Sequence, residues 1–316
     1  MVASVEPSQL AAVVVFYHPD QAAIAHVKRL AQYLTVIIID NSDDDQRTSY
    51  LKDELTHLVN GKKNGVLYIA NQKNLGIATA LNQGLEQAIS IEKKWCLLLD
   101  QDSVIDRDFV QSLSVLPNQT LCHIAAIVPR YYANNLQKYG DIIQVKPRVI
   151  KRIAPEKLQL RGDNNQSTDF VEASYAITSG SMVNLANLES IGLHDESLFI
   201  DFVDIEWGLR ANHKGFRIVT NLNATLQQQL GEQPIRLMGL NIVNHSPIRH
   251  YYYFRNVLLM LRKKHVPLIW KLVELTKLPV RFTLYSTLTS NRIKQCQSML
   301  QGLWHGLLNK KGKKTQ

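Results

Sequence analysis

Short apolar runs alternate with helix-like stripes along the first part of the chain. The runs are rich in β-branched residues and are bounded by turn-forming or charged residues, as buried parallel strands are. They cover residues 11–17, 35–40, 65–70 and 95–100. Between them, apolar residues recur at helical spacing, most clearly over residues 77–89, with Asn74 as the expected N-cap. This alternation predicts βαβ units and hence an α/β fold with a mostly parallel central sheet.

The pattern changes in the second part of the chain. Residues 131–170 are polar and lack a clear period, which indicates a long excursion or a β-flap. Strands are expected at 121–128 and 216–219 and a helix at 204–214, and a regular pattern without an assigned type returns at 171–178. From residue 248 onward the pattern is helical, and Pro267 and Pro279 are expected to interrupt it.

Composition is that of an ordinary folded protein. Of the 316 residues, 45% are apolar and 20% are charged, which excludes a disordered or collagen-like chain. The three cysteines are widely spaced and odd in number, so neither a disulfide framework nor a cysteine-based metal knuckle is expected. Residues 1–10 show no secretory signal pattern, and no apolar run approaches the roughly 20 residues of a membrane span. We therefore expect a cytoplasmic protein in a reducing compartment.

The formal net charge of +9 is unevenly distributed. Residues 261–316 hold 12 Lys and Arg and one acid, so they carry +11, whereas the remaining chain carries −2. Because the larger part is mildly acidic, we expect no nucleic-acid partner. For the basic amphipathic segment 261–316, two interpretations stay open. It contacts the anionic cytoplasmic face of the inner membrane, or it packs as helices on the rest of the chain or in a homo-oligomer.

Polar residues follow three of the predicted strands. Asp40 ends the second run, Asp100 and Asp102 end the fourth, and the segment 71–76 opens a helix after the third. Parallel strands bring their carboxyl ends to one sheet edge, which is where α/β proteins bind ligands. Two acids at i and i+2 suit a divalent cation with phosphate oxygens, and a helix start suits a phosphate or a polar base edge. Each residue alone can equally cap a helix or a turn, but their joint placement favours a ligand site.

Two further clusters follow. The segment 199–207 (FIDFVDIEW) combines acids and aromatic residues at a helix start, which suits either a general base or simple helix capping. The block 244–256 (NHSPIRHYYYFRN) contains histidines that can complete a metal site and arginines that can neutralise a pyrophosphate. Neither GxGxxG nor GxxxxGK[ST] follows the first strand, which disfavours classical dinucleotide and P-loop sites.

Six ordered motifs resemble those of the inverting family 2 glycosyltransferases of the GT-A fold, and among these the bacterial rhamnosyltransferases. The motifs are VVVFYHPD, VIIIDNS, NLGIATALNQG, LLLDQDS, TSGSMV and FIDFVDIEWGLRA, followed by HSPIRHYYYFRN. The resemblance spans residues 11 to about 260. It implies a catalytic domain over residues 1–260, with a nucleotide-sugar-binding half at about 8–128 and an acceptor-binding half at about 129–260, followed by the helical extension 261–316.

The resemblance also implies roles for individual residues. Asp204 would be the catalytic base, although Val203 stands where the family motif has a glutamate. Residues implied as metal ligands are Asp102, Asp100 and His245. Residues implied in nucleotide-sugar binding are Phe16, Tyr17, Pro19, Asp40, Asn41, Asn74, Gly76, Asn82, Asp100, Gln101, Arg249 and Arg255. Residues implied in acceptor binding are Ser179, Gly180, Asp201, Glu206 and Trp207.

The activity implied by the resemblance is transfer of a sugar with inversion, by a single displacement assisted by Mg²⁺ or Mn²⁺. The expected donor is dTDP-L-rhamnose, and the expected acceptor is a glycan or lipid-linked saccharide in cell-surface polysaccharide synthesis. One alternative is a family 2 transferase that uses another UDP- or dTDP-sugar. A less favoured alternative is a nucleotidyltransferase that forms sugar nucleotides, because such enzymes carry a Gly-rich basic loop after the first strand and FYHPD has none.

Overall fold

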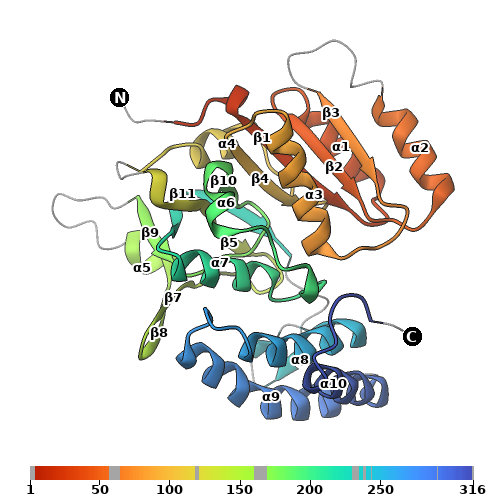
Figure 1. Ribbon diagram of the computed structural model, residues 1–316, viewed down its shortest axis with the longest axis vertical. Helices are drawn as coiled ribbons and strands as arrows, with labels where there is room; N and C mark the ends of the chain where they lie inside the picture. Colours follow the sequence, from red (N-terminus) through yellow and green to blue (C-terminus); the bar gives the residue numbers. More distant parts are fainter. Residues whose placement is uncertain are drawn as a thin grey trace.

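A mixed, mostly parallel sheet of nine strands forms the centre of the part of the chain that the structure describes (Figure 1). This computed structural model describes residues 4–56, 65–117, 121–159, 169–229, 235–237, 240–242, 244–289 and 291–314. The main path runs β3-β2-β1-β4-β10-β5-β11-β9, and β6 pairs with β5. These strands are β1 (Leu10–Phe16), β2 (Thr35–Asp40), β3 (Val66–Ala70), β4 (Trp95–Asp100), β5 (Ile124–Ala133), β6 (Lys138–Tyr139), β9 (Phe170–Ala173), β10 (Met182–Asn184) and β11 (Arg217–Gln228).

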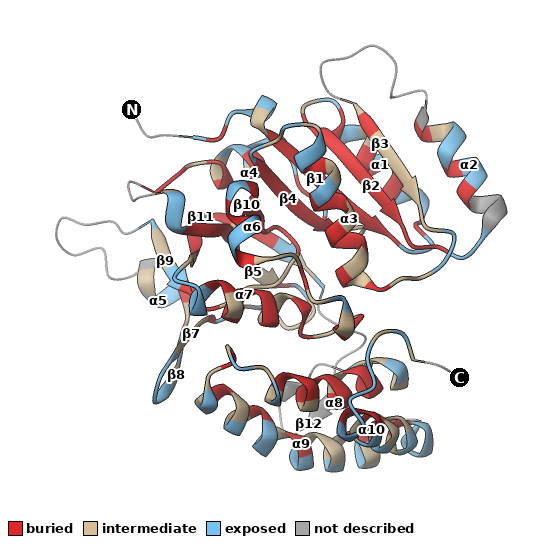
Figure 2. Ribbon diagram, in the orientation of Figure 1, coloured by how far each residue is buried: buried red, intermediate tan, exposed pale blue. Residues whose placement is uncertain are grey.

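The inner strands are apolar because both faces of the sheet are covered. Every residue of β1 and β2 is buried, as expected for parallel strands between helices (Figure 2). One core contains residues of α1 (Gln21–Leu30), α2 (Asp45–Thr56) and α4 (Arg107–Leu113). The other contains residues of α3 (Ile77–Ser90) and α7 (Val203–His213). The sheet thus forms the middle layer of an α/β fold, as the hydrophobic pattern predicted.

A separate layer of helices lies below the sheet in Figure 1. It consists of α8 (Pro247–Leu261), α9 (Leu268–Leu288) and α10 (Arg292–Leu307), with α10 packed against both α8 and α9. The layer begins with α8, so it starts earlier in the sequence than the extension expected from residue 261. Among the described helices, none combines the length and the apolar character that a membrane-spanning helix needs.

The polar stretch 131–170 contains a β-hairpin, in agreement with the expected flap. The hairpin pairs β7 (Ile142–Lys146) with β8 (Val149–Ile153), and α5 (Pro155–Gln159) follows it. Smaller elements complete the described chain, namely α6 (Leu188–Ile191) and a hairpin of β12 (Ile235–Leu237) and β13 (Leu240–Ile242). Residues 160–168 of the predicted flap lie outside the described residues.

Three local expectations were wrong or incomplete. Gly76, not Asn74, is the N-cap residue of α3, and it adopts a φ of 91° that favours glycine. Pro279 lies inside α9, although Pro267 does precede that helix. The sequence pattern also missed α2, whose apolar residues are too few to give a clear stripe, and β10, which is only three residues long.

Candidate active site

The carboxyl ends of four parallel strands meet at one edge of the sheet. In the strand register, Asp40 of β2 pairs with Phe16 of β1 and with Ala70 of β3. Asp100 of β4 pairs with Val15 of β1. The two strand-ending acids are therefore brought to the same edge, as the sequence predicted, and this is the edge where ligands bind in open α/β sheets.

Asp40 is held firmly inside this edge. It is 1% exposed, and its carboxylate accepts the Ser42 N–H at 2.8 Å and the Tyr68 hydroxyl at 2.6 Å. Burial and this bond to Asp40 raise the pKa of Tyr68, which stays a neutral donor. The backbone N–H of His18 donates to the Ser42 hydroxyl at 2.8 Å, and Pro19, the next residue, is buried. Asp40 thus fixes the turn after β1 relative to β2.

A chain of amides joins the strand ends to the start of α3. Asn41 donates to the carbonyl of Gly76 at 3.1 Å and accepts from Asn71 at 2.8 Å. The Asn74 side chain accepts the N–H of Gly76 at 2.9 Å. A Cβ placed on Gly76 would lie 2.6 Å from a ring carbon of Phe199, so only glycine fits here. The predicted helix start is therefore packed directly against the loop before α7.

The DQD segment (Asp100, Gln101 and Asp102), at the end of β4, lies next to β1. Gln101 accepts the backbone N–H of Tyr17 at 2.8 Å, and Asp100 accepts the side-chain N–H of Gln228 at 3.1 Å. Burial, and then the negative charge of Asp102, raise the pKa of Asp100 to about 6. Asp102 itself is exposed. The pair therefore offers one open and one partly buried carboxylate.

Asp204 lies in the first turn of α7, close enough to Asp100 for the two charges to interact. Burial raises the pKa of Asp204 to about 6, although backbone N–H groups including that of Ile205 stabilise its charged form. Arg249 is the nearby cation and is bound to Asp201, with an N–O distance of 2.5 Å. Its charge also acts on Asp100 and Asp204. The structure thus gathers four of the predicted site residues.

The loop before α7 is strained and is supported from α8. Phe199, Asp201 and Phe202 have φ of 65°, 66° and 65°, a left-handed region that costs free energy for residues other than glycine. Asn256 of α8 donates its side-chain amide to three carbonyl groups of the segment 198–201, at 3.0, 2.8 and 3.0 Å. This support fixes the loop that carries Asp201 and leads into Asp204.

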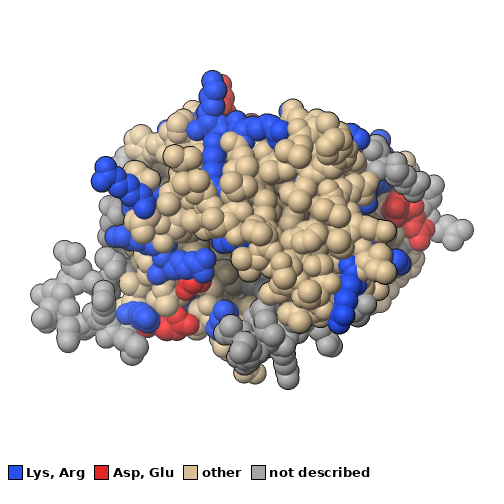
Figure 3. Space-filling model, turned by 90° about the horizontal axis from the view of Figure 1, so that it is seen from below, with Lys and Arg blue, Asp and Glu red and all other residues tan. Residues whose placement is uncertain are grey.

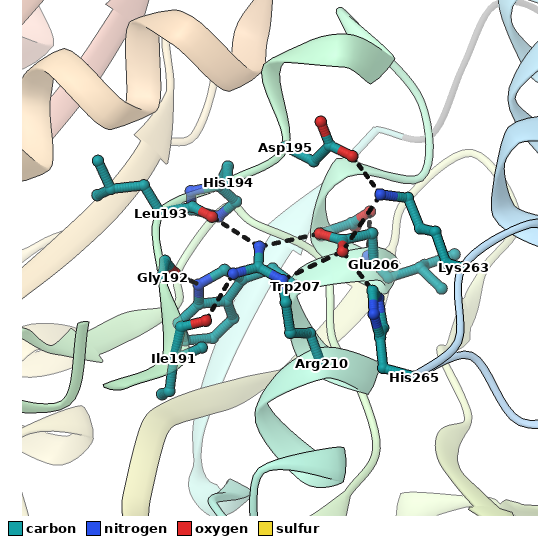
Figure 4. Close-up of polar contacts among 12 residues, drawn as sticks. Ile191, Gly192, Leu193, His194, Asp195, Glu206, Trp207, Arg210, Lys263 and His265 are labelled. Atoms are coloured by element: carbon teal, nitrogen blue, oxygen red, sulfur yellow. Dashed lines mark hydrogen bonds and ion pairs between the residues drawn. The ribbon is translucent and has the colours of Figure 1, made fainter. Parts of the chain in front are cut away.

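Glu206 lies in a network of charges with Arg210, Lys263 and His265 (Figure 4). It is 1% exposed and bonds Arg210 at 3.1 and 3.0 Å and His265 at 2.8 Å, with Lys263 at 3.6 Å. Burial alone would raise the pKa of Glu206, but the bonds from His265 and Arg210 lower it to about 2. The acceptor role expected for Glu206 does not fit this geometry. Its contacts instead join α7 to the segment between α8 and α9.

Trp207 and Asn82 are also engaged behind the site. Trp207 donates its indole N–H to the carbonyl of Gly192 at 3.0 Å and stacks on His194, with ring centroids 5.6 Å apart. Asn82 donates to the carbonyl of His194 and to Glu196, at 3.0 and 2.9 Å. Both side chains are buried, so the geometry gives them a supporting position rather than the expected contact with acceptor or donor.

Other predicted residues brace the strand ends from inside. The buried hydroxyl of Ser179 bonds that of Ser103 at 2.5 Å and accepts the N–H of Asp100 at 3.1 Å. Gly180 donates its N–H to a carbonyl of β4 at 2.8 Å. Phe16 has no exposed surface. These residues hold the DQD segment in place and do not face an open cleft.

Arg255 is placed differently from its expected role in binding the donor. It is fully buried, bonds Asn256 at 2.9 Å and donates to the carbonyl of Gly312 at 2.5 Å. His245 lies near Arg249 and Asp201, and burial and Arg249 lower its pKa to about 4. Among the described residues, no three His, Cys, Asp or Glu side chains are grouped as a metal site, so His245 is not gathered with the DQD acids.

Asp204 lines a small cavity of about 20 Å³ together with His194 and Trp207. Two larger clefts lie beside Asp102 and Arg249. One has a volume of about 510 Å³ and is lined by polar side chains and by three apolar ones, namely Asp102, Asp106, Asn134, Thr225, Gln227, Gln228 and Gln229 with Val104, Ile105 and Phe109. The other has a volume of about 450 Å³ and is lined by Tyr17, Asn74, Phe199, Ile200, Ile248, Arg249, Tyr252, Lys313 and Lys314. Predicted site residues thus line both clefts, Asp102 in the first and Tyr17, Asn74 and Arg249 in the second.

Four residues at the site were missed from the sequence. Tyr68 donates to Asp40 and Gln228 donates to Asp100, and the two residues of each pair lie far apart in the sequence. Only the order of the strands in the sheet brings these side chains together. Lys313 and Lys314 line the second cleft although their basic run indicated a membrane or subunit contact. A usable signal existed only for Tyr68, a polar aromatic residue near the end of the strand beside Asp40.

Comparisons with known proteins agree with this geometry. A model of glycosyl transferase family 2 matches residues 21–184. The chain is 31% identical to the dTDP-rhamnosyl transferase RfbF of Shigella flexneri over 305 residues, which covers 95% of this chain and 96% of that protein. It is 22% identical to the galactofuranosyltransferase GlfT1 of Mycolicibacterium smegmatis over 228 residues, or 70% of this chain and 71% of that one.

Solved structures with low sequence identity share the fold. One is a crystal structure of GalNAc-T7 with UDP, GalNAc and Mn²⁺, at a TM-score of 0.54 and 17% identity, covering 84% of this chain and 53% of that chain. Another is TarS of S. aureus, at a TM-score of 0.50 and 13% identity, covering 95% of this chain and 49% of that chain. The chain therefore spans about half the length of these two structures.

Proposed function

The chain belongs to glycosyl transferase family 2 and has the GT-A fold, and from this premise we propose that it transfers L-rhamnose from dTDP-L-rhamnose to a glycan or lipid-linked saccharide, with inversion. The sugar is supported by the 31% identity to a dTDP-rhamnosyl transferase along nearly the whole chain. Another UDP- or dTDP-sugar is the competing donor, since a second relative is a galactofuranosyltransferase.

The observation that carries the proposal is the position of Asp204. It is partly buried in the first turn of α7, within electrostatic reach of Asp100 and Arg249. Its pKa of about 6 leaves it ionised at neutral pH and more basic than an ordinary aspartate, which suits a general base. Asp204 takes the proton of the acceptor hydroxyl as that oxygen bonds to the anomeric carbon. The bond from this carbon to the diphosphate breaks, and its electron pair leaves with the diphosphate.

The two clefts differ in the chemistry that they offer to the two substrates. The cleft beside Arg249 is basic and adjoins Tyr17 and Asn74, which suits the charged diphosphate of the donor. The cleft beside Asp102 is lined by polar side chains and by Val104, Ile105 and Phe109, which suits hydroxyl groups and the apolar face of a sugar.

Asp100 and Asp102 fit a divalent cation by the chemistry of their side chains. Mg²⁺ and Mn²⁺ prefer oxygen ligands and are commonly held by one or two carboxylates together with substrate phosphates. Mutual repulsion within the pair contributes to the raised pKa of Asp100, so nearby positive charge stabilises its ionised form. When bound, the metal would neutralise charge on the departing diphosphate. The solved structure of GalNAc-T7 with Mn²⁺ and UDP supports this assignment by analogy.

The outer face of the helical layer suits an anionic membrane surface. Large apolar side chains are exposed along α9 and α10, among them Leu268, Leu272, Val280, Ile293, Leu300, Trp304 and Leu307. Figure 3 shows Lys and Arg side chains spread around a broad uncharged area on this face. An apolar face with a basic surround favours peripheral binding to anionic lipid, where a lipid-linked acceptor would lie. Pairing of this face in a homo-oligomer is the competing proposal.

A thermal-shift panel tests the donor and the metal together. We expect dTDP-L-rhamnose to stabilise the protein in the presence of Mn²⁺ more than UDP-galactose does, and EDTA to reduce the shift. A larger shift with UDP-galactose would identify that sugar nucleotide, and not dTDP-L-rhamnose, as the preferred donor. Shifts that EDTA leaves unchanged would contradict the proposed role of the metal.

The variant Asp204→Asn tests the base. It should reduce turnover of the donor by about 10²-fold or more, while the thermal shift with the donor persists. Asp53→Asn changes an exposed aspartate of α2 and is the matched control, with unchanged turnover expected. Wild-type turnover by Asp204→Asn would contradict the assignment.

A further inference from the structure

The segment after α10 folds back onto α8 and is fixed there by its backbone. The N–H of Gly312 donates to the carbonyl of Ser197 at 2.8 Å, and the N–H of Lys314 donates to the hydroxyl of Tyr252 at 2.8 Å. Arg255 donates to the carbonyl of Gly312 at 2.5 Å. Gly312 has a φ of 72°, a conformation suited to glycine, so the turn between the lysines is built into the sequence KKGKK.

The anchor of this segment is rigid. Arg255 is 0% exposed, and its guanidinium lies 5.6 and 4.8 Å from the ring centroids of Tyr251 and Tyr252. Arg255 also donates to the carbonyl of Leu198 at 2.8 Å, in the loop that leads to α7. The Lys314 ammonium lies 4.9 Å from the Tyr251 ring centroid. The position of the segment therefore depends on buried groups of α8 and not on surface contacts alone.

This fold-back places two cations at the cleft beside Arg249. Lys313 and Lys314 line it together with Tyr17 and Asn74, which come from the edge of the sheet. Arg249 is already paired with Asp201, whereas neither lysine forms an ion pair within the described part of the chain. The charged residues lining this cleft are all basic. Its unneutralised positive charge thus comes from the segment after α10.

We propose that Lys313 and Lys314 bind the diphosphate group of a substrate in this cleft, so that the segment after α10 completes the binding site. The proposal rests on the proposed function, since it takes the cleft to be that of a diphosphate-containing substrate. Lysine ammonium groups are common phosphate ligands, and a diphosphate bridging a sugar and a nucleoside carries about two negative charges, which two lysines match. The diphosphate belongs to the nucleotide sugar or to a lipid-linked acceptor.

The test compares two double variants of the full chain that each remove two positive charges from the same segment. Lys313→Gln/Lys314→Gln changes the cleft, and Lys310→Gln/Lys311→Gln changes lysines that do not line it. Calorimetric titration measures binding of dTDP, dTMP and farnesyl diphosphate at low and moderate salt, with Mn²⁺ present throughout. Binding to anionic vesicles is measured in parallel.

We expect the cleft variant to weaken dTDP binding by roughly tenfold or more and dTMP binding by less, while the control stays within about twofold of wild type. Loss confined to farnesyl diphosphate would assign the lysines to the acceptor's diphosphate. Equal binding of every ligand by both variants, or a loss of vesicle binding alone, would overturn the proposal. If wild-type protein bound no nucleoside diphosphate, the proposed function itself would fail, which is a distinct result.

Discussion

At the scale of single residues, two acids of the site are harder to ionise than ordinary aspartates. Burial raises the pKa of both Asp100 and Asp204 to about 6, and each lies within reach of further negative charge. Arg249, the cation nearest to them, is shared with Asp201. Because the two acids interact, their protons leave in coupled steps. Their protonation is therefore sensitive to the positive charge of a metal ion and to the negative charge of a diphosphate bound beside them.

Activity should fall as the pH is lowered through about 6. The base must be ionised, and with a pKa of about 6 only about a tenth of Asp204 remains ionised at pH 5. We expect kcat to drop roughly tenfold between pH 7 and pH 5, measured as dTDP release with saturating donor and Mn²⁺. A rate that stays flat down to pH 4.5 would contradict Asp204 as the base.

The same pKa predicts how stability depends on pH. Folding raises the pKa of Asp204 from 3.8 to about 6, so its contribution to stability is full below about pH 4 and is lost as the pH rises through 6. Asp204→Asn removes the ionisable group, so the free energy of unfolding should rise by about 1–3 kcal/mol at pH 8 but change little at pH 4. The melting temperature at the two pH values measures this difference, with Asp53→Asn as control.

At the scale of elements, the position of α7 depends on a strained loop and on α8. The left-handed residues of the segment 199–202 persist because Asn256 and the start of α3 hold the loop from two sides. The carbonyl of Phe199 accepts the N–H of Ile77 at 2.8 Å, so the same loop also touches the first turn of α3. The start of α3 and the loop before α7 are thereby joined at one point.

Asn256→Asp tests this support with almost no change of shape. The aspartate places negative charge against three carbonyl oxygens and loses the donated hydrogen bonds, so we expect a loss of about 2–4 kcal/mol in stability. Turnover should fall more than donor affinity does, because the loop leads to Asp204. Asn309→Asp, at an exposed position after α10, is the control. An unchanged melting temperature and unchanged turnover in Asn256→Asp would show that the loop keeps its conformation without the hydrogen bonds from Asn256.

The elements were predictable where the hydrophobic period is clear, and less so where tertiary contacts decide. β2 has the predicted bounds, and the acids Asp40 and Asp100 end their strands as expected. Glu206 could not be assigned from the sequence, because its partners Lys263 and His265 come from a segment far along the chain. The helical pattern of this region was expected, but the continuation of α9 through Pro279 was not, because a proline inside a helix normally interrupts it.

At the scale of the whole molecule, several groups of contacts attach the helical layer to the α/β part of the described chain. The charges around Glu206 bind the α8–α9 segment, and the segment after α10 reaches the loop before α7. Exposed apolar residues occur along α9 and α10, and the molecule seen from below, where this layer lies, shows a broad area without Lys, Arg, Asp or Glu (Figure 3). One face of the layer therefore supports the site while the other is available to a lipid surface or a second copy.

Vesicle binding tests the outer face. Leu300→Ser/Trp304→Ser removes two side chains that are 52% and 60% exposed on α10, and should reduce co-sedimentation with anionic vesicles several-fold. Wild-type binding should weaken as salt is raised, because the basic residues contribute. Ile89→Ser, at an exposed apolar position on α3, should bind like wild type. If the α10 variant binds vesicles normally but changes from dimer to monomer, the face is a subunit interface.

The fold-back of residues 312–314 has a practical consequence for handling the protein. Since Lys313 and Lys314 line the cleft beside Arg249, an affinity tag fused after them would emerge beside that cleft. The strand β1 begins at the opposite edge of the sheet from the carboxyl ends, so a tag placed before it would leave the cleft clear. The activity measured for this protein should therefore depend on which end carries the tag. A weak activity measured with a tag after Lys314 would reflect obstruction by the tag as well as the enzyme's own rate.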